Sequence, residues 1–239
     1  MQKEGIMSKI LVCDDDKEIV EAIKIYLSNE NYEVLTAYDG NEAIEVLKES
    51  PVDLIIMDIM MPGQDGIRTT LRIRQDNAVP IIMLSAKSED EDKILGLNIG
   101  ADDYLTKPFN PMELIARVKS QIRRYTQLGN AKEEVAGQDV YTCGDLEINN
   151  ATKEVRVSNE PIKLTPIEYN ILFLLVKNAG RVFSIDEIYE QIWNEEAFGA
   201  ADNTVAVHIR HIREKIEVNP REPRYLKVVW GIGYKVEKQ

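Results

Sequence analysis

Five polar residues in the first half of the chain each stand at the end of a short apolar segment. They are Asp14 and Asp15 after residues 10–13, Asp58 after 54–57, Ser85 after 80–84, and Lys107 after 104–106. Three carboxylates carry a charge of about −3, which one Mg²⁺ ion and the lysine ammonium would balance. A carboxylate whose charge is screened in this way can attack phosphorus and form an acyl phosphate. These residue types therefore indicate phosphoryl transfer to an aspartate.

Asp58 is the expected nucleophile of this set. It directly follows the apolar residues 54–57, so we expect it to be partly buried. A partly buried carboxylate beside two others is costly unless a cation is bound. Ser85 can donate a hydrogen bond to a phosphoryl oxygen, and Lys107 can pair with another as a point charge. A purely structural cluster would leave the presence of all these residue types unexplained.

The elements that must bring these residues together alternate between strand and helix. The apolar runs predict strands over residues 10–13, 32–37, 54–57, 80–84 and 104–106. Helical spacing of apolar residues predicts helices over residues 19–27, 42–49, 67–74, 94–97 and 111–123. This alternation is typical of an α/β fold with a doubly wound parallel sheet. Ligands bind outside the carboxyl ends of such strands, so the polar residues should converge there.

Residues 9–124 resemble the receiver domain of two-component response regulators. The matching motifs are Asp14-Asp15, residues 53–63, Ser85-Ala86 and residues 100–109. The resemblance implies a five-stranded flavodoxin-like sheet in the order 2-1-3-4-5, with Asp58 as the phosphorylated residue. It also implies that Asp15, Asp58 and the Met60 carbonyl ligate Mg²⁺. Asp14 would act on the ion through a water molecule.

The same resemblance assigns residues that sense phosphorylation. Ser85 stands where a hydroxyl senses the phosphoryl group, and Tyr104 stands where a rotating aromatic ring reports it. Without the resemblance, Tyr104 is better interpreted as an ordinary half-buried strand residue. The Lys107-Pro108 peptide bond is expected to be cis, which is uncommon even before proline.

A dimer surface is also implied by this resemblance. It comprises the expected helix around residues 94–97, strand 104–106 and helix 111–123, and its ion pairs between subunits would involve Lys93, Asp103, Glu113 and Arg117. Exposed ion pairs are individually weak, so these would set the register of the dimer more than its affinity. Asn98 stands where an acidic residue is common, so one pair with Lys119 is expected to be missing.

The second half of the chain has a different pattern. Residues 125–138 are polar with little periodicity and are interpreted as a linker. Short alternating segments then predict antiparallel strands over residues 146–148, 154–157 and 162–164. Capping boxes at residues 165–168 and 184–187 predict two helices, and a third helix begins at residue 202 or 203. Residues 225–229 and 233–236 predict a hairpin.

The third helix is basic outside its apolar stripe. Val205, Ile209, Ile212 and Ile216 share one narrow face, which must be core. The residues outside this stripe are Thr204, His208, His211 and Lys215 on one flank, Arg210 and Arg213 on the other, and Val207 near the outermost position. A basic helix on a small helical scaffold suits the major groove of DNA. A solvated amphipathic helix is an equally good interpretation of the angles alone.

Residues 139–237 resemble the winged-helix DNA-binding domain, an α+β fold, of the OmpR/PhoB subfamily. The matching segments are residues 164–169, 204–216 and 231–235. The resemblance adds Trp230 and Tyr234 in the wing to the candidate DNA contacts. Many members carry Arg where this chain has Trp230, so stacking or packing replaces a cation there. Residues 223–235 are similar to VanR-type regulators, which implies control of cell-wall or glycopeptide-response genes.

Charge and composition limit the class of protein. The chain of 239 residues has 29 Lys and Arg against 41 Asp and Glu, a formal charge of −12, whereas residues 203–239 alone carry +4. A locally basic end on an acidic chain favours a partner such as nucleic acid. The longest apolar runs are too short to span a membrane, and Cys13 and Cys143 have no metal-binding or redox spacing. We expect a cytoplasmic protein without disulfides.

These observations predict a phosphorylation-controlled transcription factor and not an enzyme. The expected partners are a sensor histidine kinase, promoter DNA, RNA polymerase and, after phosphorylation, a second copy of the chain. One alternative is a Mg²⁺-dependent aspartyl-phosphate phosphatase, but Asp58-Ile59-Met60 lacks the second aspartate typical of those enzymes. The other is an interaction module that works without phosphorylation, which would leave Asp14, Asp15, Ser85 and Lys107 unexplained.

Overall fold

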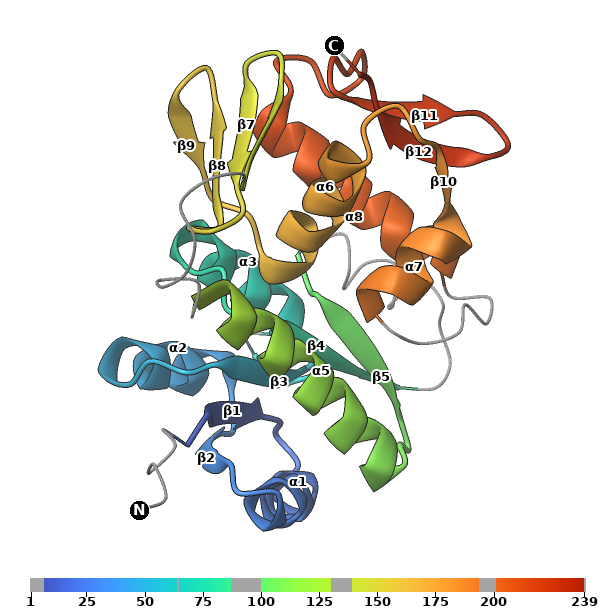
Figure 1. Ribbon diagram of the computed structural model, residues 1–239. Coiled ribbons are helices and arrows are strands. Elements are labelled where there is room, and N and C mark those ends of the chain that lie inside the picture. Colours follow the sequence, from blue (N-terminus) through green and yellow to red (C-terminus); the bar gives the residue numbers. More distant parts are fainter. Residues whose placement is uncertain (1–6, 64, 87–99, 130–138, 194–200, 239) are drawn as a thin grey trace, which may run out of the picture. The chain divides into compact units, whose positions relative to one another are not determined.

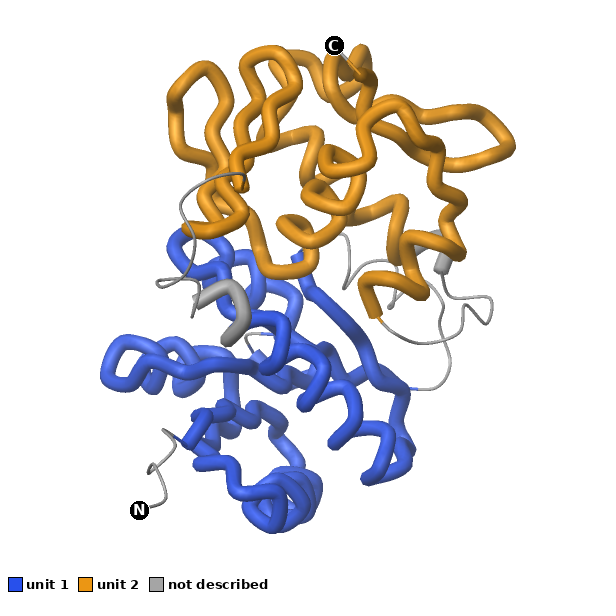
Figure 2. Tube along the Cα trace, in the orientation of Figure 1, with its two compact units in different colours: residues 1–125 blue, residues 126–239 orange. Residues whose placement is uncertain are grey.

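The computed structural model describes residues 7–63, 65–86, 100–129, 139–193 and 201–238 (Figure 1). The chain divides into two compact units, Met1–Tyr125 and Thr126–Gln239 (Figure 2). Among the described residues, no helix is long and apolar enough to cross a membrane.

The first unit is built on a parallel sheet of five strands. The strands are β1 (Lys9–Cys13), β2 (Glu33–Ala37), β3 (Leu54–Asp58), β4 (Ile81–Ala86) and β5 (Asp103–Lys107). They lie in the order β2-β1-β3-β4-β5, and every neighbouring pair is parallel. This order confirms the predicted doubly wound α/β fold. Asp58 and Lys107 are the last residues of β3 and β5, and Ser85 is the penultimate residue of β4, so each belongs to the strand that it was predicted to follow.

Helices cover both faces of this sheet. The described helices are α1 (Lys17–Asn29), α2 (Gly40–Glu49), α3 (Gly66–Asp76) and α5 (Pro111–Gly129). One core cluster joins the sheet to α1 and α5 through residues such as Ile23 and Val118. A second joins its other face to α2 and α3 through Ala43 and Ile73. The predicted helix around residues 94–97 lies outside the described residues.

The first turns of the helices use carboxylates that are near the predicted site in sequence. Asp16 caps α1, because its Oδ1 accepts hydrogen bonds from the backbone N–H groups of Glu18 and Ile19 at 2.9 and 3.3 Å. Such a cap satisfies backbone donors that the helix itself leaves unpaired. Of the run of three aspartates, Asp16 is therefore structural, and Asp14 and Asp15 remain for the site.

The second unit holds two antiparallel sheets and three described helices. The first sheet consists of β6 (Val140–Cys143), β7 (Leu146–Asn149), β8 (Glu154–Val157) and β9 (Glu160–Ile162). The helices are α6 (Pro166–Lys177), α7 (Ile185–Trp193) and α8 (Ala201–Ile216). The second sheet has the order β10-β12-β11, from Phe183–Ser184, Gly233–Val236 and Leu226–Val229 respectively. The predicted hairpin near the C-terminus is therefore present as β11 and β12.

Several features of this half differ from the prediction. The strand expected over residues 162–164 is β9 at Glu160–Ile162, and the two-residue strand β10 was not predicted. Strand β6 was not predicted, because its four residues, Val-Tyr-Thr-Cys, lack a clear alternation of polar and apolar side chains. Helix α5 continues to Gly129, so the first residues of the predicted linker 125–138 are helical. Residues 130–138 lie outside the described part of the chain.

Both predicted capping boxes are present. Glu168 accepts a hydrogen bond from the Thr165 N–H at 2.7 Å, and the Thr165 side chain accepts one from the Glu168 N–H at 3.4 Å. At the start of α7, Glu187 and Ser184 exchange bonds in the same way, at 2.8 and 3.0 Å. These reciprocal bonds explain why the two helices begin where the sequence predicts.

Gly66 allows α3 to begin directly against the end of β3. A Cβ atom built on Gly66 would lie 1.9 Å from the backbone oxygen of Asp58. We expect Gly66→Ala to lower the unfolding free energy of the first unit by about 2 kcal/mol, because the strand end must shift. Denaturant unfolding measures this loss.

Gly63→Ala is the matched control for this prediction. Gly63 has a φ of +84° and no described atom within 4 Å of an added Cβ, so alanine there meets only backbone strain. We expect a cost of about 1 kcal/mol from the left-handed conformation. Equal losses for the two variants would contradict a steric role for Gly66.

Candidate functional site

Lys107 lies at the centre of the predicted cluster. Its Nζ is 2.6 Å from Oδ2 of Asp14 and 2.7 Å from Oδ1 of Asp58. These carboxylates come from β1 and β3, two neighbouring strands, whereas Lys107 ends β5 at the edge of the sheet. The topology therefore brings together residues 44 and 93 positions away from Asp14, as the sequence predicts.

Backbone N–H groups hold both buried carboxylates in place. Asp14 Oδ1 accepts a hydrogen bond from the Asp16 N–H at 3.0 Å, and Asp58 Oδ2 accepts one from the Met60 N–H at 3.0 Å. Asp14 and Asp58 are buried, and Asp15 is exposed. The site thus combines two carboxylates of fixed orientation with a third that reaches solvent.

Burial and the neighbouring charges act in opposite directions on the titration of this cluster. Burial raises the pKa of Asp58, and this effect outweighs the hydrogen bond and charge of Lys107, which lower it. Burial alone would lower the pKa of Lys107, but the hydrogen bonds to Asp14 and Asp58 outweigh it and raise that pKa. One ammonium therefore does not fully compensate the carboxylates around it.

The donor set fits a hard divalent cation. Asp14, Asp15 and Asp58 each offer a carboxylate oxygen, and these three atoms lie within 4.8 Å of one another. Carboxylate oxygens are the ligands that Mg²⁺ takes in proteins, and the excess negative charge favours its binding. The resemblance to receiver domains implies that this acidic cluster binds Mg²⁺.

Ser85 and Tyr104 lie on the neighbouring strands β4 and β5. Ser85 is fully buried, and its Oγ has no hydrogen-bond partner among the described atoms. A buried hydroxyl without a partner is costly, which is consistent with a ligand oxygen that is not part of the protein. Tyr104 is half-buried and packs against the sheet cluster next to α2 and α3. The Lys107-Pro108 peptide bond is cis, as the resemblance implied.

The residues predicted for a dimer interface form ion pairs within one chain. Arg117 Nη1 lies 2.9 Å from Asp103 Oδ1, and Arg117 Nη2 lies 3.0 Å from Glu113 Oε1. Lys119 pairs with Glu30 at 2.6 Å. Lys93 and Asn98 lie outside the described residues. Asp103, Glu113 and Arg117, the described charges of this surface, are therefore already paired in the single chain, a feature that the sequence did not reveal.

Two cations of α8 contact their own unit. Lys215 Nζ lies 2.6 Å from Oε2 of the buried Glu168, the last residue of the α6 capping box. Arg213 donates from Nε and Nη2 to the Leu226 carbonyl at 3.0 and 2.8 Å. Arg210, in contrast, is exposed, with Glu214 3.5 Å away. The helix angles could not distinguish these three roles, because they ignore the neighbouring elements.

Several residues on the predicted outer flank of α8 are buried. They are Thr204, Val207, His208 and His211. The His208 ring lies 5.6 Å from that of Trp193, which itself stacks on Tyr189 at 4.9 Å. Sequence analysis missed this aromatic stack, although Tyr189 and Trp193 are four residues apart on the predicted α7 and so share a face.

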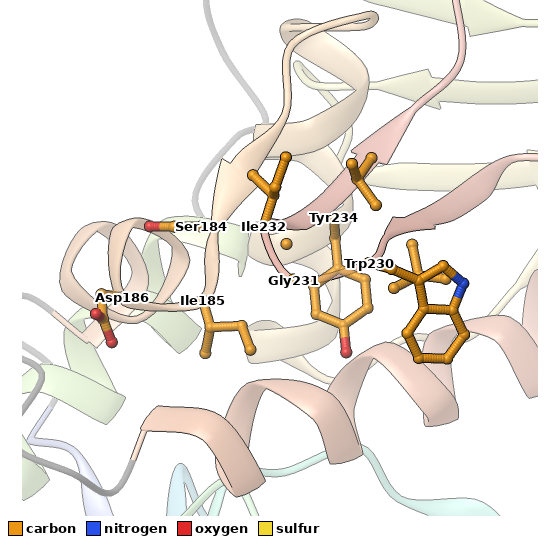
Figure 3. Close-up of a pocket in the computed structure, with 10 residues that line it drawn as sticks. Ser184, Ile185, Asp186, Trp230, Gly231, Ile232 and Tyr234 are labelled. Carbon is orange, nitrogen blue, oxygen red and sulfur yellow. The ribbon is translucent and has the colours of Figure 1, made fainter.

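The wing turn between β11 and β12 exposes a large aromatic side chain. Trp230 is 88% exposed, whereas Tyr234 is half-buried. Figure 3 shows both rings projecting from the same side of the wing, with Ile232 pointing the opposite way. A groove of about 430 Å³ separates the wing from the start of α7, where Ser184 and Asp186 line it.

Comparisons with known proteins support the same division of the chain. A family model described as "Response regulator receiver domain" matches residues 10–119. A second, described as "Transcriptional regulatory protein, C terminal", matches residues 159–236. The site described above therefore lies in the receiver match, and α8 and the wing lie in the regulatory match.

Relatives are similar over nearly the whole chain. "Regulatory protein VanR" of Enterococcus faecium is 46% identical over 96% of this chain and 99% of its own length. "Alkaline phosphatase synthesis transcriptional regulatory protein PhoP" of Bacillus subtilis is 42% identical over 96% and 97%. Both are similar across the receiver and the regulatory half together.

Solved structures resemble the whole chain as well. The response regulator DrrB of Thermotoga maritima, an OmpR/PhoB homologue, is 32% identical with a TM-score of 0.50, covering 97% of this chain and all of that one. A RitR mutant has a TM-score of 0.75 at 21% identity, with the same coverage, and so shows the fold alone. The chain belongs to the OmpR/PhoB-type response regulators, DNA-binding transcriptional regulators of two-component systems that carry a receiver domain and a C-terminal regulatory domain.

Proposed function

We propose that a sensor histidine kinase transfers a phosphoryl group to Asp58. The observation that carries this proposal is the contact of one ammonium group, that of Lys107, with both Asp14 and Asp58. A carboxylate oxygen of Asp58 attacks phosphorus while the bond from phosphorus to the histidine nitrogen breaks, and that nitrogen keeps the electron pair. Lys107 then pairs with a phosphoryl oxygen, and this new contact replaces part of the contact between Lys107 and Asp58.

Asp14, Asp15 and Asp58 would hold Mg²⁺ in this reaction, together with the backbone carbonyl of Met60. When bound, the ion would offset the carboxylate charge and screen the incoming phosphoryl group. The protein itself orients the nucleophile, since the Met60 N–H holds one oxygen of Asp58 and Lys107 holds the other. Ser85, whose hydroxyl is buried, would donate to a phosphoryl oxygen, and Tyr104 would report the change to the dimer surface.

Phosphorylation in turn promotes dimerisation and promoter binding. The dimer surface includes Lys93, Asp103, Glu113 and Arg117, and its ion pairs would exchange partners between chains. The DNA-binding surface comprises α8 and the wing, where Arg210, Lys215 and Trp230 are the exposed members of the predicted set. His208 packs on Trp193, which supports a core role for His208.

We further propose that the chain is a cytoplasmic regulator that acts on RNA polymerase and controls a VanR-type set of genes.

Labelling with a small phosphodonor tests the assignment of Asp58. In the presence of Mg²⁺, the chain should gain the mass of one phosphoryl group, and Asp58→Asn should gain none, because the amide is not nucleophilic. Intact-protein mass spectrometry measures this directly. Asp53→Asn, which changes a carboxylate outside the cluster, is the control. Labelling of Asp58→Asn at the rate of the unmodified chain would refute the proposal.

Removal of the central ammonium should destabilise the receiver. Lys107→Met leaves Asp14 and Asp58 buried without their cation, which we expect to lower the unfolding free energy by about 3 kcal/mol. Added Mg²⁺ should raise the melting temperature of the unmodified chain and recover part of the loss in Lys107→Met. Thermal unfolding in buffer without Ca²⁺, with and without added Mg²⁺, measures the melting temperature of both chains. A Lys107→Met variant as stable as the unmodified chain would contradict the central role of this contact.

The dimer surface can be tested by reversing one charge. Arg117→Glu removes the pairs with Asp103 and Glu113 and adds repulsion, so the phosphorylated variant should remain monomeric while Asp58 is still labelled. Sedimentation of the phosphorylated protein measures the dimer. Lys119→Glu, which disrupts the surface pair with Glu30, is the matched control and should dimerise. A phosphorylated Arg117→Glu variant that dimerises normally would exclude this surface.

A further inference from the structure

The end of α8 and the residue after it bind Leu226, the first residue of β11, at both its backbone N–H and its backbone carbonyl. Glu217, directly after α8, accepts hydrogen bonds from the N–H groups of Tyr225 and Leu226 at 2.8 and 2.9 Å. Its other oxygen accepts one from the Arg224 N–H at 2.6 Å. Arg213, one turn earlier, donates twice to the Leu226 carbonyl, at 3.0 and 2.8 Å. Arg213 of α8 and Glu217, directly after this helix, therefore clamp a single peptide segment.

The clamp is desolvated, which makes its bonds strong. Glu217 and Leu226 are buried, and Arg213 is half-buried. Burial lowers the pKa of the Arg213 guanidinium, although Tyr234 and Glu217 act in the opposite direction. Hydrogen bonds to charged groups are stronger than those between neutral groups. Arg213 also lies over the Tyr234 ring, 5.9 Å from its centroid, so it contacts both strands of the wing.

The other strand of the wing is fixed as well. A Cβ atom built on Gly233 would lie 1.9 Å from the Phe183 carbonyl oxygen, so β12 packs directly against β10, which leads into α7. The turn that connects β11 to β12 is short, closed by a hydrogen bond from the Ile232 N–H to the Val229 carbonyl at 3.0 Å. The position of the exposed Trp230 is thus determined by α8 through β11 and by α7 through β12 (Figure 3).

We infer that Arg213 is a positioning residue, which fixes the wing relative to α8 and so sets the distance between their two contacts with DNA. This inference rests on the proposed DNA-binding surface. Two donor groups of Arg213 bind a backbone carbonyl, which is a different task from the DNA contact predicted for this arginine from the sequence. A rigid spacing makes DNA sequences whose grooves match it bind better, a form of shape readout.

A double-mutant cycle on the full chain separates positioning from direct contact. The probe is a duplex selected in vitro for binding to the unmodified protein. The wing-tip variant Trp230→Ala with Ile232→Ala is measured in three backgrounds: unmodified, Arg213→Met and Lys215→Met. Lys215→Met is the matched control, because it removes one positive charge from the same helix and breaks a contact with Glu168 instead of the wing. Arg210→Ala is measured in the same backgrounds.

Positioning predicts a specific pattern of coupling. The wing-tip variant should lose about tenfold in affinity in the unmodified and Lys215→Met backgrounds, and less than twofold in Arg213→Met, because residues that act together are not additive. Arg210→Ala should lose about tenfold in every background. The salt dependence of binding should keep its slope in Arg213→Met, whereas loss of a phosphate contact would reduce the slope by about one. Arg213→Lys should restore part of the coupling.

Three results would overturn the inference. They are a wing-tip variant that binds like the unmodified chain, a full wing-tip loss in Arg213→Met, and a reduced salt slope in Arg213→Met. Hydrogen exchange covers the case in which Arg213→Met binds no duplex: amides of β11 and β12 should exchange faster while those of α6 do not, and equal acceleration in both would also overturn it. If Arg210→Ala has no effect and binding ignores salt, the proposed DNA-binding surface itself fails, whatever Arg213 does.

Discussion

The contact of Lys107 with two buried carboxylates is the constraint on which the first unit depends. Asp14 and Asp58 cannot lie side by side in a desolvated site without a nearby cation. The lysine comes from the edge strand β5, so β1, β3 and β5 must be parallel and in register at their carboxyl ends. With one ammonium group, the cluster keeps a net negative charge. This charge favours the binding of a divalent cation, which in turn would reduce the repulsion of an incoming phosphoryl group.

The requirements of this site extend into the local structure around it. Gly66 is needed because α3 begins against the Asp58 backbone oxygen, where a side chain does not fit. Asp16 is used as a helix cap, so that three consecutive aspartates have three different environments. The site is therefore formed by its backbone as much as by its side chains, and a change at a residue without any chemical role can still displace the nucleophile.

Sequence patterns were sufficient where each element alone determines its residues' positions. A buried strand that ends in Asp58 places that carboxylate at the sheet edge whatever its neighbours are. The α8 helix is different, since its angles describe the helix alone. The partners of Lys215 and His208 are Glu168 and Trp193, which come from other helices, so only the tertiary structure reveals that these two polar residues serve the unit's own packing. Strand β6 was missed for a similar reason, as its pairing with β7 stabilises a sequence of weak strand pattern.

The use of cations inside the second unit has a consequence for how it can recognise DNA. Arg213 and Lys215 both contact acceptors of their own unit, and Arg210 is the exposed arginine of α8. The wing tip carries Trp230, an aromatic residue, where a cation would strengthen binding to any sequence alike. Phosphate contacts by the exposed cations strengthen binding to any sequence alike, so discrimination between sequences must depend on geometry. A wing held rigidly to α8 supplies that geometry, because it rewards only DNA whose grooves present both contacts at the same spacing.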